Sequence, residues 1–434
     1  MNMMRSRYFL SVEKIAMLLL LAYPTLMLAV KGGMNGVLLL LLLLALAVSL
    51  VRPTGMNKVV WRREWTIYAA AMFAMTAAIF ISQSFNHNLS AHPHDAASRY
   101  WLAVPVFLLL QRLELKVFTV LQFAFPVAAI TGFLMAKNLG AWAENRSGIG
   151  TLDLIHFGDF ELILGVLSLL SMNWFGRDSL PLRILKIAGL LAGLAASIAS
   201  GSRGGWLAIP VFIAIFVYFK ASGIPLKMVV ASLLAALLAI TIAYFGSSTL
   251  QQRAHDFAND VTVFGNDNGN GNGNRDTSTG IRWQLYKAAV EIFSHHPVFG
   301  VGPEGFAREM KPMMEAGKLT PLAADLGRGE VHNDILSKSA GMGVFGLIAI
   351  LAIYFVPFSL FWRATKSASA QSRQAGILGI TFVSGFIVFG LTAEILSLTM
   401  ASAFYSFTVA VLLAASYNIH HGGQFAGKNK DTHV

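Results

Sequence analysis

The sequence predicts an all-α, polytopic membrane protein with about twelve transmembrane helices. The chain of 434 residues is 55% hydrophobic and only 13% charged, whereas about a quarter of the residues in a soluble protein are charged. Several apolar runs approach the length of about 20 residues that a helix needs to cross a bilayer. Lysine and arginine also fall unevenly between alternate loops, as they do in membrane proteins of fixed orientation.

The apolar runs set the order of the elements, and MNGVLLLLLLLALAVSLV at 34–51 is the clearest of them. The expected spans are 15–30, 34–51, 65–82, 100–110, 117–135, 158–175, 184–200, 204–219, 227–245, 334–361, 376–392 and 397–419. The run at 100–110 is short, and GMG at 341–343 interrupts the tenth span, which can therefore begin as a separate short helix. No small-residue cleavage site follows the N-terminal MNMMRSR, so we expect a retained first helix rather than a removed signal peptide.

Positive charge gathers in every second loop. One set of loops holds Arg5, Arg7, Lys14, Arg52, Lys58, Arg62, Arg63, Arg112, Lys116, Arg177, Arg183, Lys186, Lys220, Lys227, Arg363, Lys366, Arg373, Lys428 and Lys430. The short loops opposite hold only Lys31, Arg99, Lys137, Arg146 and Arg203. Because cytoplasmic loops carry the excess of lysine and arginine, both termini are predicted to be cytoplasmic. The net charge of +11 therefore reflects topology and does not indicate nucleic-acid binding.

This topology divides the chain into four parts. Residues 1–245 form the first nine transmembrane helices, 246–333 form one large outward loop, 334–419 form the last three helices, and 420–434 form a cytoplasmic tail. Within the large loop, GNDNGNGNGNRDTSTG at 265–280 is rich in glycine and asparagine. Such a composition cannot bury apolar surface, so this segment is predicted to be flexible.

The large loop continues into an amphipathic helix that carries an arginine. In TSTGIRWQLYKAAVEIFSHHP at 277–297, apolar residues recur at helical spacing, with Ser278 or Thr279 as the expected cap and Pro297 at or beyond the end. Arg282 falls in the first turn, where a cation opposes the helix dipole and needs a compensating anion. That anion can belong to the protein or to a ligand. The plainer interpretation is an exposed arginine that reaches water.

Two further polar positions lie at the same outer boundary. Arg203 occurs in a tight turn, SGSRGG, whose backbone N–H groups could face an anion, although a plain turn with one interfacial arginine fits as well. His332 stands in RGEVHNDIL, just before a helix that Asn333 is expected to cap. The positive end of that helix dipole favours a neutral imidazole that can accept a proton, whereas the plainer interpretation is polar packing.

Several kinds of chemistry lack their usual residues. The chain has no cysteine, which excludes disulfides and thiol catalysis. The outward loops contain no Asp-x-Asp or Asp-x-Glu pair to hold a divalent metal, and the sequence has no G-x-x-x-x-G-K-[ST] phosphate loop. Charges inside the spans are few, unlike those of proton-coupled transporters. Glu394, at the outer end of the eleventh span, comes nearest to one.

Together these elements resemble the O-antigen ligase family of Gram-negative inner membranes. The resemblance lies in SGSRGG with Arg203, in GIRWQLYKAA with Arg282 followed by PVFGVGPEGF, and in VHNDIL with His332. About twelve helices and one large periplasmic loop are usual in that family, and the order and spacing of the motifs fit. The C-terminal half also resembles O-antigen polymerases and protein O-oligosaccharyltransferases of the same superfamily.

The resemblance implies a GT-C-type glycosyltransferase that uses no nucleotide sugar, no metal and no other cofactor. Its donor would be O-antigen on undecaprenyl pyrophosphate, and its acceptor a sugar hydroxyl of the lipid A–core oligosaccharide at the periplasmic face. Arg203 and Arg282 would bind the pyrophosphate, His332 would be the general base, and the transfer would invert the anomeric centre. Nucleic acids and nucleotides are not expected as partners.

Other outward residues are weaker candidates for contacts to the acceptor or the donor. They are Arg146, Arg328 and Glu394, with Arg99 at the boundary and Trp142, Trp206 and Trp283 as possible sugar-stacking residues. Three alternatives to a ligase stay open at this point: a polymerase or protein glycosyltransferase, a transporter of lipid-linked glycan, and a structural protein of the envelope. The sequence does not identify the sugars or the oligomeric state.

Overall fold

A computed structural model describes residues 2–51, 56, 58–138, 152–220, 251 and 275–418. These residues form fourteen α-helices and short 3-10 segments. The first group is α1 Asn2–Ala29, α2 Gly33–Val51, α3 Arg63–Phe85, α4 His92–Leu110, η1 Leu115–Val120, α5 Leu121–Asn138, α6 Leu154–Leu170, α7 Leu180–Ser200, η2 Gly204–Leu207 and α8 Ala208–Lys220. The second is α11 Ser278–His295, α12 Phe306–Glu315, α13 Pro321–Gly327, α14 Asp334–Ala364, α15 Ala370–Gly390, η4 Ile395–Ser397 and α16 Thr399–Ser416.

Eight of the described helices are long and apolar enough to cross a membrane, so the chain is a polytopic membrane protein. They lie at Ser11–Ala29, Gly33–Val51, Arg63–Phe85, Leu115–Lys137, Leu180–Ser200, Asp334–Ala364, Ala370–Gly390 and Thr399–Ser416. The expected spans at 100–110, 158–175 and 204–219 also coincide with helices, namely α4, α6 and the pair η2 and α8. The expected span at 227–245 falls outside the described residues.

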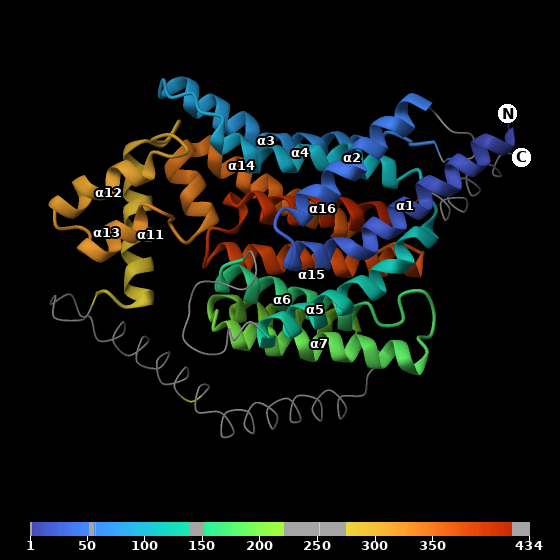
Figure 1. Ribbon diagram of the computed structural model, residues 1–434. Coiled ribbons are helices and arrows are strands. Elements are labelled where there is room, and N and C mark those ends of the chain that lie inside the picture. Colours follow the sequence, from blue (N-terminus) through green and yellow to red (C-terminus); the bar gives the residue numbers. More distant parts are fainter. Residues whose placement is uncertain are drawn as a thin grey trace, which may run out of the picture.

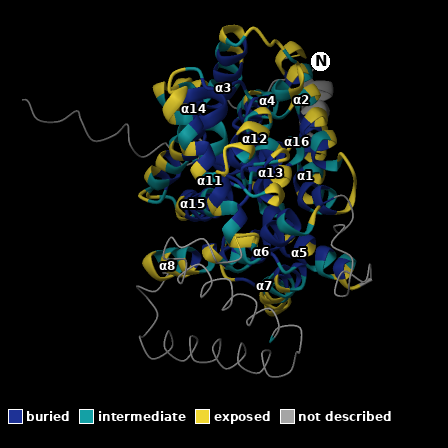
Figure 2. Cartoon of the chain, turned by 90° about the vertical axis from the view of Figure 1, so that its left-hand side faces the viewer, coloured by how far each residue is buried: buried dark blue, intermediate teal, exposed yellow. Residues whose placement is uncertain are grey.

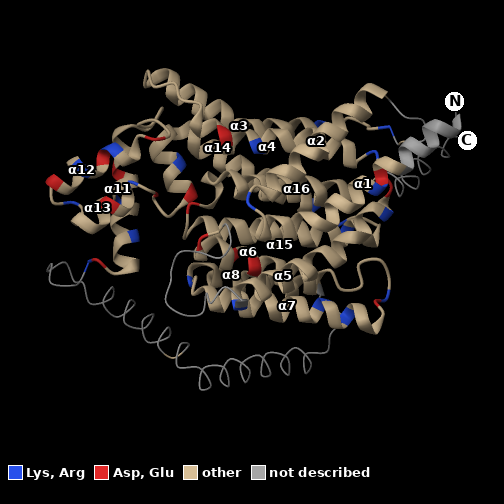
Figure 3. Ribbon diagram, viewed as in Figure 1, with Lys and Arg blue, Asp and Glu red and all other residues tan. Residues whose placement is uncertain are grey.

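The long helices lie side by side in one bundle, with the start of α1 and the end of α16 near one end and α11, α12 and α13 at the other (Figure 1). Charged residues gather toward the two ends of the bundle and in α11–α13, with long uncharged stretches between them (Figure 3). The expected cytoplasmic residues Arg63, Arg112 and Lys186 belong to the start of α3, the segment after α4 and the first half of α7. The start of α3, the end of α4 and the start of α7 lie at the end of the bundle where α1 begins (Figure 1). The start of α14 and the end of α7 lie at the opposite end, as the alternation of the spans predicts.

The bundle buries an apolar core and also exposes large apolar side chains on its outer faces (Figure 2). On α2 and α7, Leu39, Leu43 and Leu191 are each more than half exposed. In water such a surface would favour aggregation, whereas lipid tails solvate it without cost. By contrast α15 and α16 are almost wholly buried, which makes them the centre of the bundle.

Helices α11, α12 and α13 pack around a second, smaller apolar core of their own. Leu285 on α11 and Met310 on α12 are fully buried in it, and Ala323 of α13 closes it. Thr277 caps α11 by accepting a hydrogen bond from the backbone of Gly280, so the expected cap at Ser278 or Thr279 is wrong by one or two residues. Pro297 lies just beyond the helix end, as predicted.

The segment after α11 crosses the bundle where α14 is broken. Gly343 has φ +61° and ψ −147°, which confirms that GMG interrupts this span. The backbone N–H of Val344 donates to the carbonyl of Pro297 at 2.8 Å, and that of Val301 donates to the carbonyl of Ala340 at 3.1 Å. A Cβ atom on Gly343 would lie 2.3 Å from the carbonyl oxygen of Val298. Only glycine fits here, because it tolerates this backbone conformation and leaves room for the crossing chain.

Two expected loops differ in the structure. Residues 92–99, expected as outward loop, form the first two turns of α4, with Pro93 in the first turn and Asp95 favourable to the helix dipole. Because HPHDAASR is polar, the hydrophobicity pattern did not predict that the helix begins before the apolar run at 100–110. In the glycine- and asparagine-rich segment, 265–274 lie outside the described residues, whereas Ser278 already begins α11.

Candidate functional site

His332 lies at the start of α14 in an unusual backbone conformation. Its φ of +59° is left-handed, which is uncommon for a residue other than glycine. The next residue, Asn333, caps the helix by accepting from the backbone N–H of Leu336 at 3.0 Å, as predicted. Its amide also donates to the carbonyl of Leu391 at 3.1 Å, which ties the start of α14 to the end of α15. The imidazole position is therefore fixed by two helices.

Glu330 orients the imidazole ring. Its Oε1 lies 2.7 Å from Nδ1 of His332, an ion-pair distance, although the two groups are not aligned as a hydrogen bond. A carboxylate beside Nδ1 favours a proton on that nitrogen and leaves the lone pair on Nε2. The sequence argument considered only the helix dipole, whereas the structure adds the carboxylate of Glu330 beside the ring. The carboxylate was not apparent as a partner from sequence alone.

Arg282 lies one helical turn before Tyr286 on α11, and Tyr286 reaches the His332 segment. The Tyr286 hydroxyl lies 2.9 Å from the carbonyl oxygen of His332 and 2.8 Å from that of Leu391, and it can donate to either. Burial raises the pKa of Tyr286 although the charge of Arg282 opposes it, so the phenol remains a donor. Tyr286 thus joins α11, one turn beyond Arg282, to the segment that carries His332.

The turn that contains Arg203 packs against α6. Ser202 donates to Oδ1 of Asp159 at 3.3 Å, and a Cβ atom on Gly205 would lie 2.0 Å from that same oxygen. The two glycines after Arg203 therefore allow close approach, in addition to any role in presenting N–H groups. The charge of Arg282 also acts on Asp159. Asp159 is the shared neighbour of the two arginine-bearing segments, which come from distant parts of the chain.

Glu394 holds the His332 segment from the side of α15. Its Oε2 accepts from the backbone N–H of Val331 at 3.2 Å, and its Oε1 accepts from Ser337 at 2.6 Å and lies 3.1 Å from Lys338 Nζ. Burial alone would raise the pKa of Glu394, but Lys338 and the hydroxyl donors outweigh it and lower the pKa below its ordinary value. Its carboxylate is occupied by these protein contacts. It therefore supports the loop that carries His332.

The other expected residues are less closely joined to this group. Arg328 is exposed at the end of α13, two residues before Glu330. The guanidinium of Arg99 is held locally and donates to Asn35, Ser98 and Asp95. The exposed Trp283 has the ammonium of Lys287 5.2 Å from its ring centre. Trp206 lies in η2, beside the Arg203 turn. Arg146 and Trp142 fall outside the described residues.

Sequence reasoning missed the start of α6. Asp153 caps this helix, accepting from the backbone N–H groups of Ile155 and His156, and its Oδ2 lies 2.5 Å from Nδ1 of His156. Burial would raise the pKa of Asp153, but these hydrogen bonds and the imidazole lower it, so the carboxylate is charged at neutral pH. The polar letters D, H and D in LDLIHFGDF were the available signal. Asp153 and His156 preceded the expected span at 158–175 and Asp159 fell within it, and none of them was proposed as a site residue.

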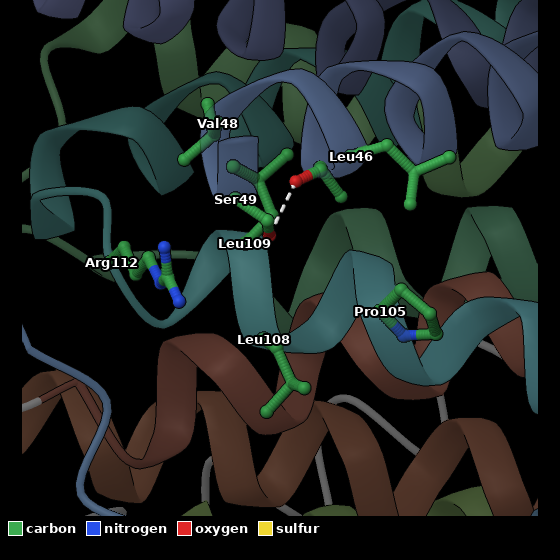
Figure 4. A pocket seen from close by; sticks show the side chains of 8 residues that line it. Leu46, Val48, Ser49, Pro105, Leu108, Leu109 and Arg112 are labelled. Carbon is green, nitrogen blue, oxygen red and sulfur yellow. Dashed lines mark hydrogen bonds between the residues drawn. The ribbon is translucent and has the colours of Figure 1, made fainter. Parts of the chain in front are cut away.

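A small cavity of about 90 Å³ lies elsewhere, between α2 and α4 (Figure 4). It is lined mainly by apolar side chains, among them Leu46, Pro105 and Leu108, with Arg112 at one side. Arg112 follows the C-terminal end of α4, whereas the other end of that helix faces the α11–α13 cluster through the His92–Glu304 pair. The cavity is therefore separate from the His332 group.

Comparison with known proteins adds a family to this geometry. Residues 188–351 match the O-antigen ligase (Wzy_C) family model, a stretch that contains Arg203, Arg282 and His332. The chain is 23% identical over 316 residues to an uncharacterized protein of Haemophilus influenzae, covering 72% of this chain and 76% of that protein. It is 24% identical over 251 residues to the O-antigen ligase of Escherichia coli, covering 57% of this chain and about half (54%) of that protein. This chain therefore carries a domain of the O-antigen ligase (Wzy_C) family and is a distant homologue of the Escherichia coli O-antigen ligase.

Proposed function

We propose that this protein is an O-antigen ligase that acts in lipopolysaccharide biosynthesis. It transfers O-antigen polysaccharide from undecaprenyl pyrophosphate to a sugar hydroxyl of lipid A–core. The observation that carries the proposal is the convergence of the Arg203 turn, Arg282 and His332 at one end of the bundle, within the stretch that matches the family. Two cations and one base are the groups that displacement of a lipid diphosphate requires.

The arginines are assigned to the leaving group. A guanidinium presents a planar fork of N–H donors that binds phosphate oxygens in pairs. As the bond between the sugar C1 and the diphosphate oxygen breaks, the bond electrons pass to that oxygen. Arg203 and Arg282 stabilise the negative charge that develops there. They supply the positive charge that a divalent metal supplies in other glycosyltransferases, so the reaction is metal-independent.

His332 is assigned to the acceptor. Its Nε2 takes the proton of the incoming hydroxyl while the hydroxyl oxygen forms the new bond to C1. Attack from the face opposite the diphosphate inverts the anomeric centre. Glu330 beside Nδ1 stabilises the imidazolium that forms, because the carboxylate lies 2.7 Å away. The proton leaves for solvent before the next cycle.

The same proposal sets the protein in the inner membrane of a Gram-negative bacterium. Both termini are cytoplasmic, and the loop at 246–333 with α11–α13 faces the periplasm, where the lipid-linked donor is available. Residues 1–245 and 334–419 are the transmembrane parts of a GT-C-type fold of about twelve spans, and 420–434 are the cytoplasmic tail. The lipid chain of the donor enters sideways from the bilayer.

A polymerase or a protein O-oligosaccharyltransferase would use the same leaving group and differ only in the acceptor. The decisive experiment is therefore transfer by the purified protein, with a defined lipid-linked donor and each candidate acceptor supplied in turn. We expect a product with lipid A–core, formed equally well in EDTA. Transfer only to a second lipid-linked glycan, or only to protein serine, would replace the ligase assignment. Loss of activity in EDTA that Mg²⁺ restores would contradict the role of the arginines.

A further inference from the structure

The first turns of α6 carry two buried polar atoms without a hydrogen-bond partner in the described part of the chain. These atoms are Nε2 of His156 and Oδ2 of Asp159. His156 is 5% exposed and Asp159 is 0% exposed. The remaining polar atom of each is occupied, Nδ1 of His156 by Asp153 and Oδ1 of Asp159 by Ser202. Native proteins pair nearly all buried polar atoms, so each of these calls for an explanation.

These two side chains border the proposed reaction site. Residues three apart on a helix share one face, and this face of α6 is turned to the Arg203 segment. Asp159 lies against that segment, because its Oδ1 accepts from Ser202 at 3.3 Å. The charge of Glu330, the neighbour of His332, acts on His156, and the charge of Arg282 acts on Asp159. The pair therefore lies beside the Arg203 turn, within reach of the charges of Glu330 and Arg282.

The charges around the pair indicate what kind of group it can bind. Asp153, Asp159 and Glu330 are the carboxylates that act on His156, so a second phosphate would be repelled there. Among the residues that the structure describes, no three His, Asp or Glu side chains gather as a metal site. A carboxylate oxygen accepts a hydrogen bond, and an imidazole nitrogen accepts or donates one according to its protonation. Such a pair suits a neutral ligand with neighbouring hydroxyl groups.

We propose that His156 and Asp159 bind hydroxyl groups of the transferred sugar, the ring joined directly to the lipid diphosphate. This sugar must lie between the arginines that hold the diphosphate and the base that activates the acceptor. Asp159 contacts the Arg203 turn through Ser202, and the charge of Glu330, beside His332, acts on His156. The inference rests on the proposed function, because it takes the diphosphate to lie at Arg203 and Arg282. It assigns to α6, which lies outside the matched stretch 188–351, a part in donor specificity.

Two probes separate the sugar from the diphosphate. Binding to the purified protein is measured for undecaprenyl pyrophosphate and for undecaprenyl pyrophosphoryl-glucose. We expect the wild-type protein to bind the glucose-bearing probe roughly 10-fold or more tightly than the bare one, since hydrogen bonds to charged groups contribute that much. His156→Ala and Asp159→Ala should lose most of this gain while binding bare undecaprenyl pyrophosphate as before. Arg282→Ala should weaken the binding of both probes.

Glu161→Gln is the matched control. Glu161 is also a fully buried carboxylate of α6 without a partner among the described residues, but it faces Gly132 of α5 rather than the Arg203 turn. This variant should keep the full gain. Where an alanine variant fails to fold, Asp159→Asn and His156→Gln preserve side-chain size and should lose a smaller part of the gain. Deoxyglucose probes add a test of contact, because a variant that lacks the partner no longer distinguishes the missing hydroxyl.

The outcomes divide clearly. If His156 and Asp159 variants weaken both probes equally, or neither, the sugar assignment is wrong. It is also wrong if only the KM for the acceptor rises, which would assign the pair to the acceptor. If the wild-type protein transfers glycan to no acceptor but still binds the glucose-bearing probe more tightly, and these variants lose that difference, the proposed function is wrong and the sugar site is supported. If the protein transfers glycan and the variants keep the tighter binding of the glucose-bearing probe, the proposed function is supported and the sugar site is wrong.

Discussion

At the scale of single residues, the proposed role of the two arginines is supported by their surroundings as well as by their charge. The Arg203 turn contacts Asp159 through Ser202, and the charge of Arg282, from a distant part of the chain, acts on the same carboxylate. An arginine whose guanidinium is only hydrated at the membrane boundary would not need to lie near the same buried carboxylate as a second arginine-bearing segment. The planar fork is what a diphosphate requires, and a lysine offers only a point charge.

We therefore expect Arg282→Ala to lower kcat/KM for the donor by at least roughly 10²-fold, from the loss of paired charge-assisted hydrogen bonds. Arg282→Lys and Arg203→Lys should recover only part of the activity. The exposed Arg275, which precedes the same helix and contacts the carbonyl of Lys318, gives the control Arg275→Ala with near-normal activity. Full activity in both lysine variants would instead favour a general interfacial charge.

A test of His332 needs a variant that removes the imidazole without straining the left-handed backbone at this residue. Its φ of +59° means that alanine would add strain, whereas asparagine tolerates this conformation. His332→Asn should therefore fold normally, bind undecaprenyl pyrophosphate normally, and transfer about 10²–10⁴ times more slowly, the usual effect of removing a general base. Single-turnover kinetics on bound donor measure this. Lost donor binding with normal turnover would move His332 to the phosphate site.

At the scale of elements, α14 does not act as one rigid rod. The break at Gly343 receives the backbone of residues 297–301 and so joins the α11–α13 cluster to the bundle. Phe85 at the end of α3 stacks on Phe299 with ring centres 4.0 Å apart, which holds the crossing segment from the other side. The position of Arg282 relative to His332 depends on this crossing.

Gly343→Ala should destabilise the protein by about 2 kcal/mol or more, because the left-handed conformation is strained for alanine and its Cβ would meet the carbonyl of Val298. Thermal unfolding in detergent measures the change. Gly36→Ala in α2 is the matched control, since a Cβ there meets nothing within 4 Å and helix propensity improves. Equal stability of the two variants would show that the break is not constrained by the crossing chain.

Glu394 makes the same region sensitive to acid. A carboxyl group whose pKa is lowered by folding contributes stability above its unfolded pKa and loses it as pH falls through the folded value. Protonation therefore begins to weaken this network below the ordinary glutamate value of 4.5. The unfolding temperature should fall as the pH drops below about 5, and Glu394→Gln should reduce that fall while lowering stability at neutral pH. An unchanged pH dependence in the variant would contradict the role of this carboxylate.

At the scale of the whole molecule, orientation decides whether the site meets a periplasmic substrate. The excess of lysine and arginine at the end where α1 begins and α16 ends predicts that this end is cytoplasmic (Figure 1). The α11–α13 cluster then faces outward together with Arg203, Arg282 and His332. A donor already carried across the membrane could reach them without being moved further.

The absence of cysteine from the chain makes this orientation testable with single introduced thiols. Lys311 on α12 and Lys366 after α14 are both exposed. A membrane-impermeant maleimide should label Lys311→Cys in cells with a permeabilised outer membrane, and should label Lys366→Cys only after the inner membrane is opened. The opposite pattern would invert the topology and remove the periplasmic reaction.

From the sequence alone, the class of protein and the order of the helices could be predicted, and three candidate site residues could be proposed. Membrane insertion and orientation depend on the length of each apolar run and on the charges of the flanking loops. They can therefore be predicted without knowledge of tertiary contacts. The cap at Asn333 and the break at GMG were predictable for the same reason, because each depends on neighbours in sequence. Glu330 was visible beside His332, but its contact with the ring depends on the left-handed turn at that residue.

Only the tertiary structure decided which distant groups meet. Asp159 is contacted by Ser202 and influenced by the charge of Arg282, both distant in sequence. The hydroxyl of Tyr286 reaches the carbonyls of His332 and Leu391. Glu394, expected as a possible substrate contact, is bound instead to Lys338, Ser337 and the backbone of Val331. Packing brings these segments within a few ångströms although many residues separate them. The sequence pattern does not specify these distances. A buried polar residue such as His156 therefore gives the same sequence signal whether it faces a functional site or a neighbouring helix.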